Sequence, residues 1–441
     1  MNVSEVRNGL AEMGPAWLAG AIAAGPATIG SLVLAARFGY DLLWVVLLSA
    51  PAGFVTLLLA ARLGTFTEQG IVATVENRLG EGWAWLLVAD TVLVSMVAQL
   101  LIMFTLATIS SQLFGFDTRL WGLIWAIVLA VGLAGGGYRV AEIGAKLIVT
   151  AVVLVFVATL VVVPPDPGAA AAGLVPSAPD GSAMAITAVL GGAVHVTLVT
   201  MHTYTMRARG WDADDYGLAR FDAGASMLAA FGLYSVAIFL VVAGTLGGQE
   251  VAPTAGAAAA ALQPVVGDAA VTLFLVGILG AAVSTLGGNT HVPPFLVADK
   301  LGWGTTVDDA RYRALLAGTA LVSAGGAFVS GNFVQLLAQA LVIGAVGTPF
   351  ALALVLYLLH DGADRRKPTT ALSVAGVLVM AIVSVTAGNS VREMLQGLSR
   401  EVTVVATLSV LFAVAVAVAT VALGAKFLLR QRDGPAAEPA D

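Results

Sequence analysis

Three ionisable side chains fall inside long apolar stretches of this chain, where charge is rarely tolerated. Asp90 lies deep within the apolar stretch 83–113, and both His195 and His202 lie within the stretch 183–206. Burying such a group is costly unless a partner or a bound ion compensates it, so an ionisable residue at membrane depth marks a functional site by default. An imidazole also exchanges protons near neutral pH. Ion binding and proton transfer are therefore the chemistries that these residues predict.

The two histidines, taken together, do not predict a metal site. They are seven residues apart, so on a continuous helix they share a face but lie about 10 Å apart, too far to bind one ion at about 2.1 Å each. Only an unwound segment would bring them together. If they are not brought together, each histidine is either a hydrogen-bonded packing residue or a functional residue that acts on its own. The chain has no cysteine, and its apolar stretches contain neither HExxH nor paired carboxylates, so we expect neither an enzyme nor a cofactor.

The elements that must position these residues are membrane-spanning helices. The chain is 59% hydrophobic and 11% charged, with a mean hydropathy of +0.94, and its apolar stretches repeatedly reach the roughly 18 residues that cross a bilayer. We therefore expect an all-α polytopic membrane protein with about 12 transmembrane helices. The predicted spans are 13–36, 42–63, 83–113, 120–136, 143–163, 183–206, 222–244, 268–296, 311–329, 332–359, 369–387 and 402–428.

The positive charges predict that both termini are cytoplasmic. With the N-terminus inside, every Lys and Arg except Arg37, Arg119, Arg392 and Arg400 falls in a segment that this topology places inside, as the positive-inside rule requires. The predicted parts are a cytoplasmic N-terminus (1–12), a first five-span repeat (13–163), an external loop (164–182), a second five-span repeat (183–359), spans 11 and 12 (369–428) and a cytoplasmic tail (429–441).

Two of the predicted spans carry helix breakers near their centres. Gly25-Pro26 lies in the middle of span 1, and Gly191-Gly192 precede His195 in span 6. Non-helical backbone at membrane depth is tolerated only where it lines a cavity or is buried in protein. Spans 1 and 6 open the two five-span halves, as an inverted-repeat transporter of the LeuT type requires. The alternative for Gly25-Pro26 is a simple packing kink.

Several segments of the chain carry a distinctive pattern of motifs. They are Gly14-Pro15-Ala16-Trp17-Leu18, Gly25-Pro26-Ala27-Thr28, the run from Phe38 to Ser49, Ala61 to Gly64, Trp85 to Asp90, and the stretches 335–339 and 348–352. These segments resemble those of the Nramp family of metal transporters. The resemblance covers residues 14 to about 360 and implies a LeuT-type 5+5 inverted repeat with two additional C-terminal spans. It also implies secondary transport by alternating access.

The resemblance fails where the family binds its metal. The family's Asp, Asn and Met ligands fall on Gly25, Thr28 and His195, and two acidic residues of its proton-coupled members fall on Val97 and Leu100. A bare divalent cation without a nearby carboxylate leaves most of its charge uncompensated, at a cost of several kcal/mol. We therefore expect a substrate other than a transition-metal ion. Thr28 and His195 are the only candidate metal ligands that remain.

The resemblance also implies roles for charged and titratable residues away from the ligands. In the family, an acidic residue of span 3 and an Arg pair form a charge network on the cytoplasmic side, which corresponds to Asp90, Arg311 and Arg313. The second histidine of the family's span 6 corresponds to His202, for which we expect proton relay or gating. We expect His195 to contact the substrate.

Polar groups near the two breaks complete the predicted site. Hydroxyl groups beside a half-helix N-terminus suit a neutral or anionic solute. The polar side chains near the breaks are Thr28, Ser31, Thr197, Thr200, Thr203 and Tyr204, with Ser284, Thr285, Asn289 and Thr290 from span 8, and half of them are instead expected to bond to carbonyls of their own helices. The expected substrate contacts are Gly25, Pro26, Thr28, His195, Thr197, Leu198 and Thr200, with Gln339 as a polar contact from span 10.

The interpretation that follows is a secondary active transporter of a small solute or ion in the bacterial cytoplasmic membrane. A proton is the candidate coupling ion, membrane lipid is the expected surrounding, and no nucleic acid is expected as a partner. One alternative is a proton-coupled transporter of a divalent cation (manganese, iron or magnesium) with a remodelled site. Another is a non-transporting membrane sensor built on a transporter scaffold.

Overall fold

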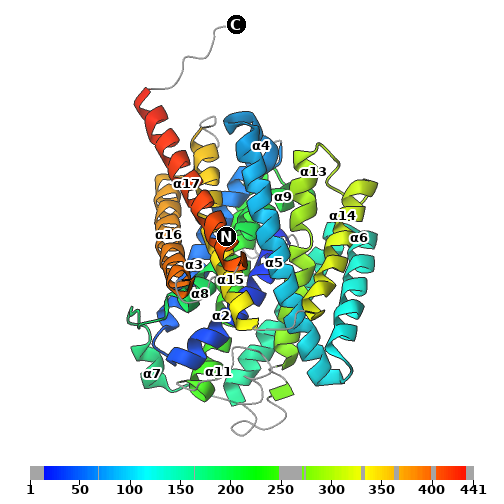
Figure 1. Ribbon diagram of the computed structural model, residues 1–441, viewed down its shortest axis with the longest axis vertical. Coiled ribbons are helices and arrows are strands. Elements are labelled where there is room, and N and C mark those ends of the chain that lie inside the picture. Colours follow the sequence, from blue (N-terminus) through cyan, green and yellow to red (C-terminus); the bar gives the residue numbers. More distant parts are fainter. Residues whose placement is uncertain are drawn as a thin grey trace.

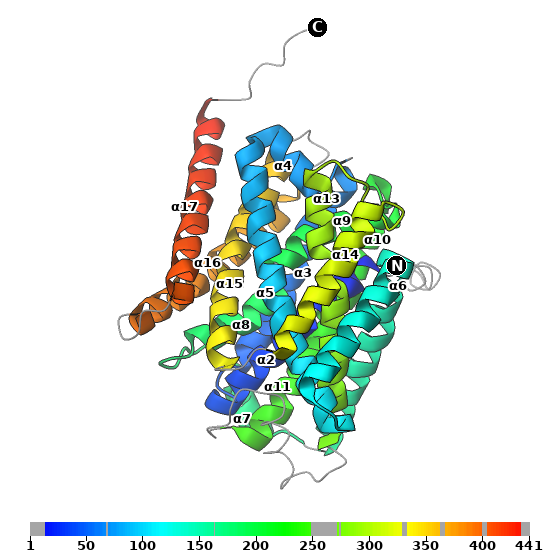
Figure 2. The same ribbon diagram turned by 45° about the vertical axis from the view of Figure 1, so that its right-hand side comes forward.

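The computed structural model describes residues 14–67, 69–162, 164–247, 271–272, 275–328, 333–361, 367–398 and 404–433. Within these ranges the chain is helical and contains no strand. The helices form one bundle, with α16 and α17 on its outside (Figures 1 and 2). The elements are α2 (Pro15–Phe38), α3 (Leu43–Phe66), α4 (Ile71–Leu79), α5 (Glu81–Phe114), α6 (Thr118–Val162), α7 (Pro167–Ala172), α8 (Ala183–Ala193), α9 (Val196–Arg209), η1 (Ala213–Asp215), α10 (Tyr216–Ala223), η2 (Gly224–Phe231), α11 (Gly232–Leu246), α13 (Val292–Lys300), α14 (Ala310–Ser323), η3 (Ala324–Phe328), α15 (Phe333–His360), α16 (Thr370–Leu398) and α17 (Val404–Asp433).

Every predicted span has a helical counterpart, which confirms the fold class. Eight helical stretches of the described chain are long and apolar enough to cross a membrane, and the stretch Val346–His360 is apolar but shorter. The loop predicted between spans 4 and 5 is helical, so both spans belong to α6, whose 45 residues exceed the roughly 20 needed for one crossing. α17 continues to Asp433 and thus includes the first residues of the predicted cytoplasmic tail.

The breaks in the spans differ from those predicted. Span 6 is broken as predicted, because α8 ends at Ala193 and α9 begins at Val196. The predicted break in span 1 is wrong, since α2 runs without interruption through Gly25-Pro26. Proline removes only one backbone donor, and a helix surrounded by other helices can absorb that loss. Span 8, predicted as continuous, is interrupted by a turn at Thr290-His291.

The two ends of the bundle carry different short helices, which serve here as reference points. In both views α4 and α13 lie at one end and α7 at the other (Figures 1 and 2). We call these the α4 end and the α7 end. The topology predicted from the positive charges places the α4 end in the cytoplasm.

Candidate functional site

The break in span 6 places one ionisable side chain at the start of a half-helix. Val194 and His195 leave the helical conformation, with φ and ψ of −123° and 40° for Val194 and of −74° and 144° for His195. His195 is the N-cap of α9, and its Nδ1 lies 2.7 Å from Thr197 Oγ1. This contact fixes the orientation of the imidazole and leaves Nε2 directed toward α15.

Two glycines of α15 bring His195 and Asp90 to the same helix face. A Cβ atom on Gly344 would lie 2.6 Å from His195 Nε2 and 3.5 Å from Val94 Cγ1, and a Cβ on Gly347 would overlap the carboxylate of Asp90. Residues three apart on a helix are neighbours, with about 5–6 Å between their Cβ atoms. The α15 backbone therefore separates His195 from Asp90 by about one helical turn, and only glycine leaves room for both side chains.

Asp90 is the least compensated charged group of the described chain. It is 0% exposed, and neither carboxylate oxygen has a hydrogen-bond partner among the described residues. A carboxylate in such surroundings is unfavourable by several kcal/mol unless a cation or a proton accompanies it. The arrangement can therefore bind or release a cation.

The predicted network of Asp90 with Arg311 and Arg313 does not form. Both arginines are exposed near the start of α14. Arg311 binds Asp309 through Nε at 3.1 Å and Nη2 at 2.8 Å, while Arg313 Nη1 reaches Val307 O at 3.5 Å. The Arg311 side chain, followed by its backbone N–H, holds the pKa of Asp309 well below its usual range. The predicted network is absent because Arg311 pairs with Asp309, which lies two residues before it in the sequence.

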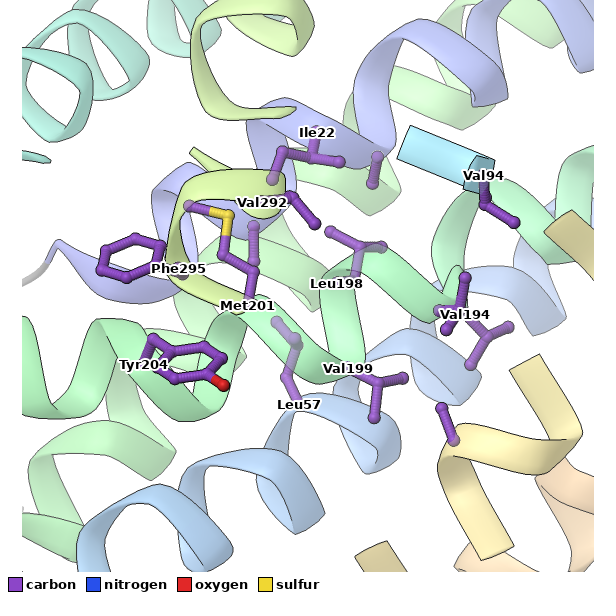
Figure 3. Packing of buried hydrophobic residues seen from close by; sticks show 14 of the residues in the cluster. Ile22, Leu57, Val94, Val194, Leu198, Val199, Met201, Tyr204, Val292 and Phe295 are labelled. Carbon is purple, nitrogen blue, oxygen red and sulfur yellow. The ribbon is translucent and has the colours of Figure 1, made fainter. Parts of the chain in front are cut away.

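Several predicted substrate contacts are already satisfied within the protein. Thr200 Oγ1 donates to Val196 O at 2.9 Å, and Leu198 is fully buried in the apolar core. Figure 3 shows Leu198 among Ile22, Val292 and other apolar side chains. Of the expected contacts, His195 and Thr197 form the polar lining at the break. The side chains of Gly25, Pro26, Thr28 and Gln339 lie outside the described part of the structure.

His202 is separated from His195 by two turns of regular helix. It is 1% exposed, and its Nδ1 lies 3.2 Å from Thr205 Oγ1. Because the unwound segment ends at His195 and regular helix follows from Val196, the break does not bring the two histidines together. The two imidazoles therefore cannot share one ion, as the spacing predicted. More generally, the described residues contain no group of three or more His, Asp or Glu side chains that could hold a metal ion.

A network at the α4 end ties three segments together that are far apart in the sequence. Asp299 Oδ2 accepts hydrogen bonds from Val72 N at 3.1 Å, Ala73 N at 3.2 Å and the Tyr204 hydroxyl at 2.6 Å. Asp299 thus caps α4 and connects it to the end of α9. Gly70 is required here, because a Cβ would lie 2.5 Å from Tyr204 Cε1.

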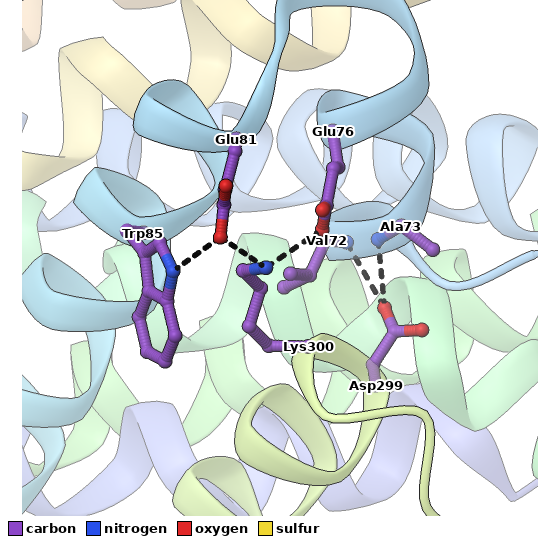
Figure 4. A network of polar contacts seen from close by, with 7 residues as sticks. All are labelled: Val72, Ala73, Glu76, Glu81, Trp85, Asp299 and Lys300. Atoms are coloured by element: carbon purple, nitrogen blue, oxygen red, sulfur yellow. Dashed lines mark hydrogen bonds and ion pairs between the residues drawn. The ribbon is translucent and has the colours of Figure 1, made fainter.

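Lys300 adds an ionic contact next to this cap. Its Nζ lies 3.0 Å from Glu76 Oε2 and 3.5 Å from Glu81 Oε1, and 4.9 Å from the centre of the Trp85 ring. Figure 4 shows Lys300 between the two carboxylates, with Asp299 reaching α4 beside it. Sequence analysis missed this network, although the Asp-Lys pair at the end of span 8 is a visible signal.

Replacing Asp299 with alanine should destabilise the protein markedly. The variant removes the acceptor of Ala73 N and of the Tyr204 hydroxyl and leaves Val72 N with only its 3.4 Å contact to Tyr204 Oη, at a cost of about 2–4 kcal/mol. Thermal unfolding in detergent measures this loss. The control is Asp308→Ala on the following loop, since Asp308 is exposed and accepts one bond, from Thr306 Oγ1. Equal melting temperatures of the two variants would contradict the assignment.

A second buried acid, which the sequence did not single out, holds the start of α2. Asp222 accepts hydrogen bonds from Gly14 N at 3.0 Å and from Ala16 N at 2.7 Å. Ser226 Oγ donates to Ala16 O at 2.6 Å. Asp222 is the first residue of predicted span 7. Acidic residues are common at the ends of membrane spans, so the sequence alone did not indicate that this one is buried.

Comparisons with known proteins agree with this architecture. The family model described as "Natural resistance-associated macrophage protein-like" matches residues 16–393. A protein of Deinococcus radiodurans named divalent metal cation transporter MntH is 26% identical over 408 residues, covering 89% of this chain and 92% of the relative. A protein of the same name from Yersinia pestis is 27% identical over 302 residues, covering 65% of this chain and 73% of the relative.

Solved structures show the same fold. A crystal structure of a mutant of the Eremococcus coleocola manganese transporter superposes with a TM-score of 0.76 at 17% identity, covering 98% of this chain and 97% of the other. Mhp1, a nucleobase-cation-symport-1 family transporter, gives a TM-score of 0.54 at 14% identity over 91% of this chain and 96% of the other. The predicted LeuT-type fold is thereby confirmed. The family match over most of its length shows that this chain belongs to the natural resistance-associated macrophage protein (Nramp) family of membrane transporters.

Proposed function

We propose that this protein is a secondary transporter of a divalent metal cation, with a site remodelled around His195 and Asp90. The observation that carries the proposal is the buried Asp90 carboxylate without a partner in the described chain, one turn of α15 away from His195. The names of the relatives, which are divalent metal cation transporters, favour this alternative over the non-metal substrate expected from the sequence.

The remodelled site suits a hydrated ion better than a bare one. Gly25 provides no carboxylate at the family's Asp position, and the described residues contain no cluster of three ligand side chains. A magnesium ion gives up its water reluctantly and is usually held through one or two carboxylates with several waters retained. Asp90 would balance part of the charge, while His195 and Thr197 would hold the water shell. Alternating access around this fixed site would carry the ion across the membrane.

Uptake of magnesium and of manganese into proteoliposomes tests the proposal. We expect His195→Ala to raise the apparent Km for the transported cation by about tenfold and to change kcat less, because the residue holds the hydrated ion in the bound state. His360→Ala is the matched control, since His360 bonds to Leu356 O and Ser373 Oγ at the far end of α15. Uptake of neither cation by the wild-type protein would exclude metal transport.

A neutral or anionic solute is the second candidate substrate. The missing carboxylate at position 25 favours it, because its absence removes one negative charge that would repel an anion. A thermal-shift screen against organic acids, amines and nucleobases tests this candidate. Stabilisation by a solute, together with failure of both metals to bind in calorimetry, would select it.

A further inference from the structure

The break in span 8 exposes backbone oxygens deep inside the bundle. The helical segment 275–289 ends in a turn at Thr290-His291, and α13 then begins at Val292. Pro293 and Pro294 follow, and neither can donate to the carbonyl four residues earlier. The carbonyls of Asn289 and Thr290 therefore lose their intrahelical donors. Such a break is tolerated only where the freed groups find other partners or line a cavity.

Polar side chains of α5 face this break. Ser95 Oγ donates to Asn289 O at 3.3 Å, and Asn289 Nδ2 donates to Ser95 O at 2.9 Å and to Gln99 Oε1 at 3.2 Å. Gln99 Nε2 in turn donates to Thr290 Oγ1 at 2.8 Å. All four residues are at most 1% exposed. These hydrogen bonds fix span 3 against span 8. They bring several side-chain and backbone oxygens together at the break.

Two buried oxygens, one on α5 and one at the break, have no partner within the described structure. They are Asn289 Oδ1 and Thr91 Oγ1, on residues that are 1% and 0% exposed. Thr91 lies one turn before Ser95 on the same face of α5. By contrast, Thr105 on the same helix donates to the carbonyl of Leu101. A buried oxygen without a donor or a cation is unfavourable, so a ligand at this position would compensate both atoms.

We infer that a sodium ion binds between α5 and the span 8 break, with Asn289 Oδ1, Thr91 Oγ1 and the freed Asn289 carbonyl among its ligands. The named ligands are all oxygens, which suits a hard cation. None is a carboxylate, so a divalent ion would leave more charge uncompensated than a monovalent one. The C-terminal end of segment 275–289 adds the negative end of a helix dipole. Unwound carbonyls and half-helix C-termini bind coupling sodium ions in inverted-repeat transporters.

Thermal unfolding of the purified protein tests this site without any divalent metal. The melting temperature is measured in choline chloride and again after choline is replaced by sodium or by potassium at the same ionic strength. We expect the melting temperature to rise with sodium and to saturate, because sodium binds the folded state. Potassium and choline should give no comparable rise. Coupling of this sodium to uptake rests on the proposed transport function, whereas its binding does not.

The variant Thr91→Val gives the sharper result. Its hydroxyl has no partner in the described chain, so its removal should leave the melting temperature in choline unchanged or higher. The half-saturating sodium concentration should rise about tenfold through loss of one ligand. Thr105→Val is the matched control, because it removes a buried hydroxyl from the same helix that is bonded to its own backbone. It should keep the sodium dependence of the wild type.

Three results would overturn the inference. They are equal melting temperatures in all three salts, an equal response to sodium and potassium, or an unchanged sodium dependence in Thr91→Val. The last result would mean that water alone fills the site. Loss of metal uptake with the sodium response retained would refute the proposed transport function only. Metal uptake with no sodium response would refute this site only.

Discussion

We expect Asp90→Asn to reduce cation uptake by at least about 100-fold while raising the stability of the protein. The carboxylate is buried without a counter-charge in the described structure, so the neutral amide removes a charge that is unfavourable in the empty site. The same change removes the charge that balances the transported ion, a loss of about 3–5 kcal/mol. Uptake into proteoliposomes and the melting temperature, measured on the same preparation, test both parts.

The opposite directions of these two effects separate a functional role for Asp90 from a structural one. A residue that only supports packing would lose stability and uptake together. Asp117→Asn is the control, because Asp117 is exposed and accepts one bond from Arg119 N. Uptake by Asp90→Asn within about twofold of wild type would rule out Asp90 as the charge that balances the ion.

The second large effect is expected at the start of α2, where Asp222→Asn should loosen the attachment of this helix to span 7. The amide has one oxygen for the two N–H groups of Gly14 and Ala16, so one buried donor is left unpaired, at about 1–3 kcal/mol. This weakens the contact that holds the start of α2 on Asp222 and should raise the population of molecules in which α2 is released there by about 5-fold to 150-fold. We expect uptake to fall with it.

Labelling of a single introduced cysteine measures this release directly. The natural chain has no cysteine, and Ala19→Cys places one on α2 at a position that is 4% exposed. A thiol reagent should modify it faster in the Asp222→Asn background, in proportion to the population shift. Asp212→Asn, which alters an exposed cap of η1, serves as the control. Equal labelling rates in the two backgrounds would show that Asp222 does not hold the start of α2 in place.

The sequence predicted the helices well because their signals are local. Long apolar stretches, glycine pairs and the distribution of positive charge depend on neighbouring residues, and so the spans and the break before His195 were found. Gly25-Pro26 shows the limit of this reasoning, since α2 continues through it. Whether a proline breaks a helix depends on the helices packed around it, which periodicity does not reveal.

The partners within the candidate site were predicted less well, because they are set by packing between distant segments. Asp90 was identified as a buried acid, but it lies against Gly347 of α15, and Arg311 pairs with Asp309 instead. A glycine that makes room for a carboxylate looks in sequence like any other small residue of a membrane helix. The prolines after Thr290 were a visible signal for the span 8 break, and their meaning became clear only once Asn289 was seen against α5.

Helix α15 contacts the candidate site with one face and the outer helices α16 and α17 with another. Its Gly344 and Gly347 lie against His195 and Asp90. Its Val346 and Pro349 line an apolar cavity of about 260 Å³ that α16 and α17 complete. Only 22% and 17% of the apolar windows of these two outer helices are buried, so their remaining surface meets lipid. We therefore expect membrane thickness and lateral pressure to act, through α16 and α17, on the helix that separates the two ionisable groups, and the turnover of the transporter to depend on the surrounding lipid.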